Sequence, residues 1–177
     1  MKNKMLEKLT REELYGLIAM YAKNWLAMDG VWFQSIEQKF GMNEAMVHDE
    51  AAWKRFTEIE ARRIKEFLGL PEQAGLEGLK QALALRFYAN INPDEAVIEG
   101  NTLLYRTREC RVQSARSRKG MELHPCKTVG LVEYGGFARV IDSRFTCECI
   151  SCYPDITDES CACAWLFTLH PKEAAAD

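Results

Sequence analysis

The distribution of cysteine is the strongest constraint on this chain of 177 residues. All of the cysteines lie in its last third or so, at Cys110, Cys126, Cys147, Cys149, Cys152, Cys161 and Cys163. Their odd number, 7, argues against a framework of disulfides. Scattered buried cysteines would not produce C-x-C-x-x-C followed closely by C-x-C. Such clustering is more typical of metal ligands or reactive thiols, so the sequence predicts a metal site.

Composition limits the class of protein. Hydrophobic residues make up 47% and charged residues 28%, which is ordinary for a globular domain, and the net charge of −3 gives no general attraction to nucleic acid. No apolar run approaches the ~20 residues that span a bilayer. The opening sequence MKNKMLEKLTREELYG lacks the apolar stretch of a signal peptide. We therefore expect a cytoplasmic protein that binds neither nucleic acid nor membrane.

The first half of the sequence has helical periodicity. Thr10 and Glu13 form a capping-box signature, and apolar residues then recur every three or four positions up to an expected stop at Asp29–Gly30. Further helices are expected over residues 32–40, 43–69 and about 76–87. Their aromatic stripes are typical of a helix-bundle core, although they could also line an apolar cavity.

The pattern changes after residue 88. We expect a hairpin over residues 96–106, a short basic helix over 111–119, a glycine-containing helix over 125–141, and strands over 144–150 and 162–169. Helices followed by hairpin-linked strands predict an α+β fold, with N-terminal helices packed on a C-terminal antiparallel sheet. We expect one domain over residues 1–171, with a helical part at 5–88, a cysteine-rich part at 89–171, and a frayed tail at 172–177.

The spacing of the cysteines suggests how a metal would be held. A Cys-x-x-Cys pair such as Cys149 and Cys152 suits tetrahedral zinc, but the two side chains would point to opposite faces of a continuous strand. We therefore expect the strand to end near Ile150. Cys126, from a helix start, and Cys163 would complete four ligands, with Cys161 as the alternative to Cys163. Zinc is the default metal, and an iron–sulfur cluster is the less favoured alternative.

Several polar residues stand out from their surroundings. Glu60 interrupts the apolar stripe of the third helix, where it must pair with an arginine or face a polar pocket. Glu133 lies on the same helical face as Cys126, in space opened by glycines. Arg111 and Arg116 belong to a short basic segment that is either a solvated surface or an anion site. We take these four residues as candidate ligand contacts.

Five segments of the sequence carry a resemblance to known families. The segments CRVQSARSRKG, HPCKTVGLVEYGGFARVIDSRFTCECISC and CAW, together with the earlier DGVWFQSIEQKFG and AWKRFTEIEARRIKEFLG, resemble an uncharacterised bacterial family of small cytosolic proteins. That family is similar to the amino-thiazoline-carboxylate hydrolase-like group. More distantly, the C-terminal half resembles the four-vinyl-reductase domain, a zinc-containing small-molecule sensor. This resemblance implies Cys126, Cys149, Cys152 and Cys163 as the zinc ligands.

Two functional hypotheses follow. The leading one is a non-enzymatic, zinc-containing domain that binds a small apolar or aromatic ligand. That ligand could also carry an anionic group. A homodimer is compatible with the sequence. The alternative is a hydrolase of a cyclic amide or thiazoline-like substrate, with Cys126 as nucleophile and His124 or Glu133 as base. Both hypotheses need the sulfur of Cys126, so they compete. A thiol redox protein is a third, less favoured interpretation.

Overall fold

The computed structural model describes residues 3–171, and the tail expected at 172–177 lies outside them. In chain order the elements are η1 (Leu6–Lys8), α1 (Arg11–Phe40), α2 (Met42–Leu68), α3 (Gly75–Leu83), η2 (Phe87–Asn90), β1 (Asp94–Glu99), β2 (Thr102–Thr107), α4 (Arg111–Arg118), α5 (Lys127–Ile141), β3 (Phe145–Cys152) and β4 (Cys163–Leu169). The expected α+β fold is confirmed. No helix within residues 3–171 combines the length and apolar character needed to cross a bilayer.

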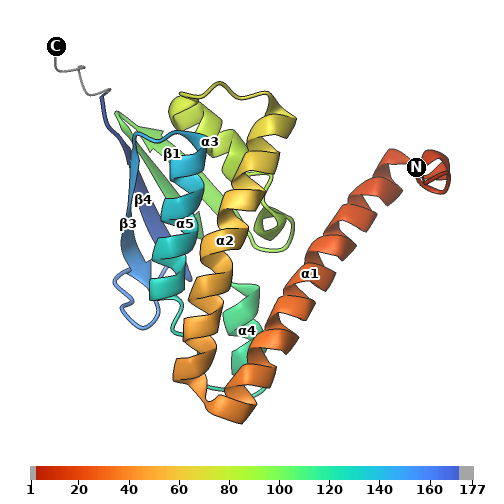
Figure 1. Cartoon of the computed structure of the whole chain (residues 1–177), viewed down its shortest axis with the longest axis vertical. Coiled ribbons are helices and arrows are strands. Elements are labelled where there is room, and N and C mark those ends of the chain that lie inside the picture. Colours follow the sequence, from red (N-terminus) through yellow and green to blue (C-terminus); the bar gives the residue numbers. More distant parts are fainter. Residues whose placement is uncertain (1–2, 172–177) are drawn as a thin grey trace.

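The sheet has four antiparallel strands in the order β1-β2-β4-β3. Helix α5 packs across one face of the sheet and α2 packs on the far side of α5, which gives three layers (Figure 1). The core lies between these layers, where Leu103, Phe137 and Phe167 are fully buried. Alternating apolar residues on β2 and β4 face this core, as the period of two along a strand requires.

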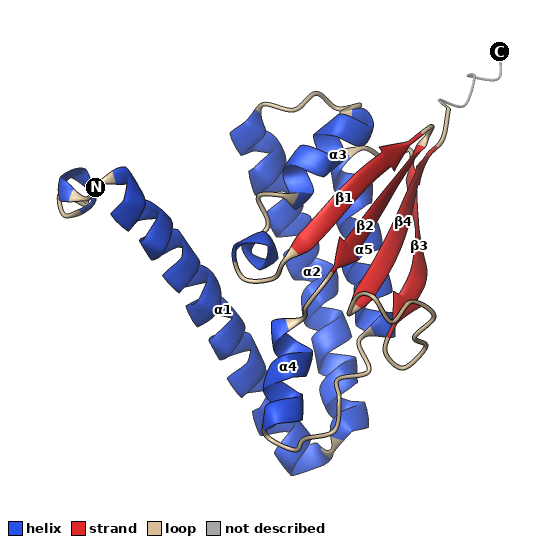
Figure 2. Ribbon diagram, turned by 180° about the vertical axis from the view of Figure 1, so that it is seen from behind, coloured by secondary structure: helices blue, strands red, loops and turns tan. Residues whose placement is uncertain are grey.

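Helix α1 is longer than the sequence predicted. It runs without interruption through Asp29 and Gly30 to Phe40, so the expected stop at Gly30 is wrong. Glycine costs a helix only about 1 kcal/mol relative to alanine, and good helix formers on both sides offset that cost. The true break is Gly41, whose φ of 90° turns the chain into α2. In both views α1 diverges from α2 toward its N-terminal end (Figures 1 and 2).

The strand β3 also differs from the prediction. It continues past Ile150 to Cys152, and a bulge between Cys149 and Ser151 inserts one extra residue opposite β4. The bulge reverses the alternation of side chains, so Cys149 and Cys152 lie on the same face of the sheet. The expected end of the strand near Ile150 is therefore wrong, and the bulge, not a strand end, places the two cysteines on one face.

A third boundary differs at the fourth predicted helix, which ends at Leu83 rather than near Phe87. Arg86 is extended, with φ −62° and ψ 151°, and a separate 3-10 turn follows it. The Nε of Arg86 donates a hydrogen bond to Glu60 on α2 at 2.9 Å. Arg86 makes this buried contact from outside the helix, three residues after α3 has ended.

Candidate ligand-binding cavity

A cavity of about 360 Å³ lies among α1, α2, α4, the start of α5 and the adjoining end of the sheet. Its volume is in the range of small-molecule sites, which is roughly 300–1,000 Å³. Phe33, Trp53, Tyr88, Val112 and Trp165 form apolar parts of its wall. Helix α4 lies beside the converging ends of α1 and α2 (Figure 2), and its residues Val112 and Ala115 are part of the cavity lining.

Three predicted metal ligands reach one end of this cavity. Cys126 directly precedes α5, Cys152 is the last residue of β3, and Cys163 is the first residue of β4. The sulfurs of Cys126 and Cys152 are 3.5 Å apart, and Cys152 and Cys163 are register partners in the sheet. The thiols come from three consecutive elements, and the packing of α5 on the paired strands β3 and β4 brings them into one place.

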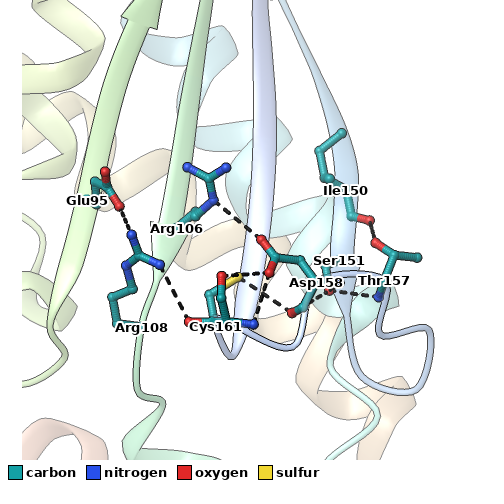
Figure 3. Close-up of polar contacts among 9 residues, drawn as sticks. Glu95, Arg106, Arg108, Ile150, Ser151, Thr157, Asp158 and Cys161 are labelled. Atoms are coloured by element: carbon teal, nitrogen blue, oxygen red, sulfur yellow. Dashed lines mark hydrogen bonds and ion pairs between the residues drawn. The ribbon is translucent and has the colours of Figure 1, made fainter.

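The other predicted ligands lie elsewhere. Cys149 shares the core-facing side of β3 but is separated from Cys152 by the bulge, and it stands opposite Trp165. Cys161 belongs to the loop between β3 and β4, where its thiol donates to the carbonyl oxygen of Asp158 at 3.8 Å (Figure 3). The backbone N–H groups of Thr157 and Asp158 both donate to Ser151 Oγ at 3.0 Å, and these bonds hold the loop against β3.

Within residues 3–171, no group of three or more His, Cys, Asp or Glu side chains has an arrangement that could hold a metal ion. The cysteine-rich metal site predicted from the sequence is thus not shown by the fold. What the fold does provide is the convergence of Cys126, Cys152 and Cys163. All seven cysteines are free of disulfide bonds.

His124 and Asp49 lie near Cys126 in the cavity wall. The Nε2 of His124 lies 3.0 Å from Oδ2 of Asp49, and the His124 ring packs 4.8 Å from the Phe33 ring between centroids. Gln113 fixes this segment, because its amide accepts from the His124 N–H at 3.0 Å and donates to the Cys126 sulfur at 3.4 Å. Asp49, His124 and Cys126 therefore form a row along the cavity wall.

The electrostatics of this row favour a charged pair. The hydrogen bond with Cys152 and the neighbouring His124 ring lower the pKa of Cys126 to about 5, although burial opposes the shift. Burial also opposes the charged form of His124, but its contacts with Asp49 and Cys126 raise its pKa to about 9. At neutral pH these values place a thiolate beside an imidazolium.

Of the four predicted ligand contacts, Arg111, Arg116 and Glu133 line the cavity. Arg116 is buried and its Nη1 donates to Glu37 at 2.9 Å, so its charge is already compensated. Arg111 remains exposed at the first residue of α4. Of the two predicted arginines, Arg111 is therefore the one whose charge no described ion pair compensates, and the exposed Arg118 also lines the cavity.

Glu60 and Glu133 share a different partner. The buried Arg86 guanidinium lies 2.9 Å from Glu60 and 2.6 Å from Glu133. The predicted pairing of Glu60 with an arginine is confirmed, and the pocket interpretation of Glu60 loses its basis because its charge is satisfied. Burial raises the pKa of Glu133 to about 7, although Arg86 acts in the opposite direction.

Two acidic residues of the cavity were missed by sequence reasoning. Asp49 follows Ala45 and precedes Trp53 at intervals of four on the buried face of α2, which is the signal that identified Glu60. Asp29, on α1, was interpreted only as part of a helix stop. Burial and the nearby charge of Asp49 raise the pKa of Asp29 to about 6.

The fold and the cavity define an α+β domain in which helices enclose a small-molecule-sized space against one end of an antiparallel sheet. The chain belongs to a family of unknown function, DUF6125, whose model matches residues 7–169. No curated protein matches the chain, and no solved structure does so either.

Proposed function

We propose that this chain is a small-molecule-binding domain whose cavity takes an apolar or aromatic compound with an anionic group. The observation that carries this proposal is the cavity of about 360 Å³. Ligand sites are typically concave and mostly apolar, with a few polar groups that fix orientation. Trp53, Tyr88 and Val112 supply the apolar wall, and the deeper polar groups are already engaged with one another.

The preference for an anion rests on the cationic side chains of the cavity wall. Lys23 of α1 and Arg111 of α4 line the cavity, and neither forms an ion pair with another described residue. A guanidinium offers a carboxylate two parallel N–H donors. The interior carboxylate Asp49 would repel an anion, so the apolar part of the ligand would lie inward and its anionic group beside Arg111.

The experiment is isothermal titration calorimetry with a panel of aromatic carboxylates. We expect saturable binding with one site per chain. Ala115→Trp on α4 fills the cavity and should abolish binding, because Ala115 lines it. The control is Ser114→Trp at the preceding position, which is exposed and does not line the cavity, so binding should be unchanged. No saturable heat across the panel, or equal binding by the two variants, would contradict the proposal.

We propose further that zinc binds where Cys126, Cys152 and Cys163 converge. The support is the sulfur geometry: two thiolates on tetrahedral zinc, with Zn–S of about 2.3 Å, lie roughly 3.8 Å apart, and the sulfurs of Cys126 and Cys152 are 3.5 Å apart. Cys149 remains the predicted fourth ligand. His124 is the competitor, because its buried Nδ1 has no hydrogen-bond partner among the described residues while Asp49 holds Nε2.

Bound zinc would tie the start of α5 to the β3–β4 hairpin. Metal analysis of the purified chain with thiol counting tests this proposal. We expect one zinc per chain, lost in Cys152→Ser and retained in Cys161→Ser, whose thiol faces the loop. Comparing Cys149→Ser with His124→Ala identifies the fourth ligand. Absence of zinc after metal-replete expression, with Cys126 and Cys152 alkylated at the same rate before and after a chelator is added, would refute it.

A cysteine-dependent hydrolase is the second candidate, and the specific observation in its favour is the row Cys126–His124–Asp49. In this mechanism the Cys126 thiolate attacks the carbonyl carbon of a cyclic amide, forming a C–S bond. The C–N bond then breaks and the leaving nitrogen takes its proton from the His124 imidazolium. His124 next accepts a proton from the water that hydrolyses the thioester, while Asp49 keeps the ring oriented.

The zinc and hydrolase proposals make opposite predictions for Cys126. Rapid alkylation of Cys126 by iodoacetamide at pH 6.5, with loss of rate in His124→Gln, favours the nucleophile. Slow alkylation that becomes rapid only after a chelator is added favours the metal ligand. Cys110 is the internal control, since burial raises its pKa to about 11 and it should react slowly in both cases.

A further inference from the structure

Helix α1 carries an apolar stripe that the rest of the described chain covers only in part. Ile18, Tyr21, Trp25, Met28 and Trp32 are each between 45% and 66% exposed. Their spacing alternates between three and four residues, the repeat by which one helix presents a continuous seam to another. In the N-terminal half of α1, from Arg11 to Trp25, Ala22 alone is buried among the described side chains.

The direction of α1 explains this exposure. The helix diverges from α2 toward its N-terminus, so the two helices pack only where they converge (Figures 1 and 2). Phe56 of α2 stacks on Trp25 with ring centroids 4.9 Å apart, and this covers one side of the indole. A hollow of about 180 Å³, lined by Trp25, Met28 and Trp32 of the stripe and by the adjoining Asp29, remains open beside it.

We infer that this stripe is the contact surface of a homodimer, in which α1 of one copy packs against α1 of a second copy about a twofold axis. A twofold contact requires a surface that is complementary to itself, and a heptad-spaced stripe with an open hollow meets this condition. The side chains of one copy would enter the hollow of the other. The homodimer that is compatible with the sequence would form through this stripe.

The area supports a second copy as the occupant. Large apolar side chains bury ~150–250 Å² each, so five that are about half exposed offer on the order of 500 Å² per copy. Two copies together would then bury roughly 1,000 Å², the lower bound for a specific interface. A single exposed apolar side chain needs no partner, whereas a contiguous patch of this size, comparable to the largest on a typical monomer, is often functional.

Dimer formation would also fix one wall of the cavity. Leu26, Asp29 and Phe33 of α1 line the cavity from the neighbouring faces of the same helix. In a monomer, α1 packs against the rest of the domain on one side only, so the cavity wall that it forms can move. In the dimer, α1 of the second copy would restrict that movement. The test below uses no ligand, so its failure is distinct from failure of the binding proposal.

The experiment is analytical ultracentrifugation of the full chain over a range of concentrations. We expect a dimer at micromolar concentration. Tyr21→Glu with Met28→Glu should weaken the dimer by about 100-fold or more, because each copy then presents two carboxylates to the apolar seam. The matched control is Val47→Glu with Phe67→Glu, at apolar positions on α2 that are at least as exposed. The control should remain a dimer.

A second measurement does not depend on variants. Amides of α1 between Tyr15 and Met28 should exchange with deuterium more slowly at high than at low protein concentration, while those of α5 stay unchanged. A monomeric wild type, a dimer that survives Tyr21→Glu with Met28→Glu, or equal dissociation of the control would overturn the inference. So would a monomer that instead binds vesicles of phosphatidylcholine and phosphatidylglycerol, because the stripe would then be a membrane surface.

Discussion

The buried triad of Arg86, Glu60 and Glu133 offers a sharp test of the packing between α2 and α5. The Arg86 side chain is 1% exposed, and each carboxylate is 9% exposed. The guanidinium carbon of Arg86 also lies 4.9 Å from the centroid of the Phe137 ring. Arg86→Met keeps the volume and removes the charge, which leaves two carboxylates without their cation in a nearly dry environment.

Removing one partner from a buried ion pair costs ~3–5 kcal/mol. We expect Arg86→Met to lower the free energy of unfolding by that amount, a large share of the ~5–15 kcal/mol of a typical domain. The control is Arg62→Met. Arg62 pairs with Glu58 at 3.1 Å on the surface of α2, with side chains 61% and 51% exposed, and such pairs contribute about 0–1 kcal/mol.

Urea denaturation followed by tryptophan fluorescence measures both variants. The pH dependence adds a second check. Burial raises the folded-state pKa of Glu133 to about 7, so its contribution to stability is complete below the unfolded value of 4.5 and falls as the pH rises through 7. Loss of Arg86 raises this pKa further, so the penalty should be smaller at pH 5 than at pH 8. A loss below 1 kcal/mol, or a penalty equal to that of Arg62→Met, would refute this reasoning.

Three further predictions concern stability. Gly130→Ala should cost about 1–3 kcal/mol in urea denaturation, because a Cβ there would lie 2.5 Å from Cη2 of the buried Trp165; a neutral result would mean that the ring can move aside. Gly16→Ala on exposed α1 meets no atom within 4 Å and should instead stabilise the protein by up to about 1 kcal/mol; a loss of stability in the same assay would argue against a free helix surface there. Hydrogen bonds from Arg144 hold the pKa of Asp142 at about 2, so the stability it provides is present above the unfolded value of 3.8 and is lost as the pH falls through 2. Asp142→Asn should remove about 1–2 kcal/mol at pH 7 and flatten the acid limb of the stability curve; an unchanged limb would contradict the assignment.

Local signals in the sequence were sufficient for much of the fold. The helix over residues 43–69, the hairpin over 96–106 and the short basic helix after Cys110 all form close to their expected limits. Of the three glycines of α5, Gly130 packs against Trp165 and Gly136 lies beside Thr57, and both of these side chains come from other elements. Periodicity and turn chemistry depend on neighbouring residues, so they are visible in one sequence.

Apart from the helix stop expected at Gly30, the errors arose where distant contacts decide the outcome. The bulge in β3 depends on pairing with β4, and no local pattern at Ile150 encodes it. Arg86 leaves the helical path to meet Glu60 and Glu133, which lie 26 and 47 positions away in the sequence. The cavity needs α1 beside α4, two helices with no sequence relationship that would predict their contact.

The proposed binding function can be tested directly with 8-anilinonaphthalene-1-sulfonate, a fluorescent aromatic anion. Titration of the wild-type chain should give saturable fluorescence with one site, which disappears in Ala115→Trp and persists in Ser114→Trp. Fluorescence that rises without saturation, or that is equal in all three proteins, would show that the cavity does not bind this class of compound.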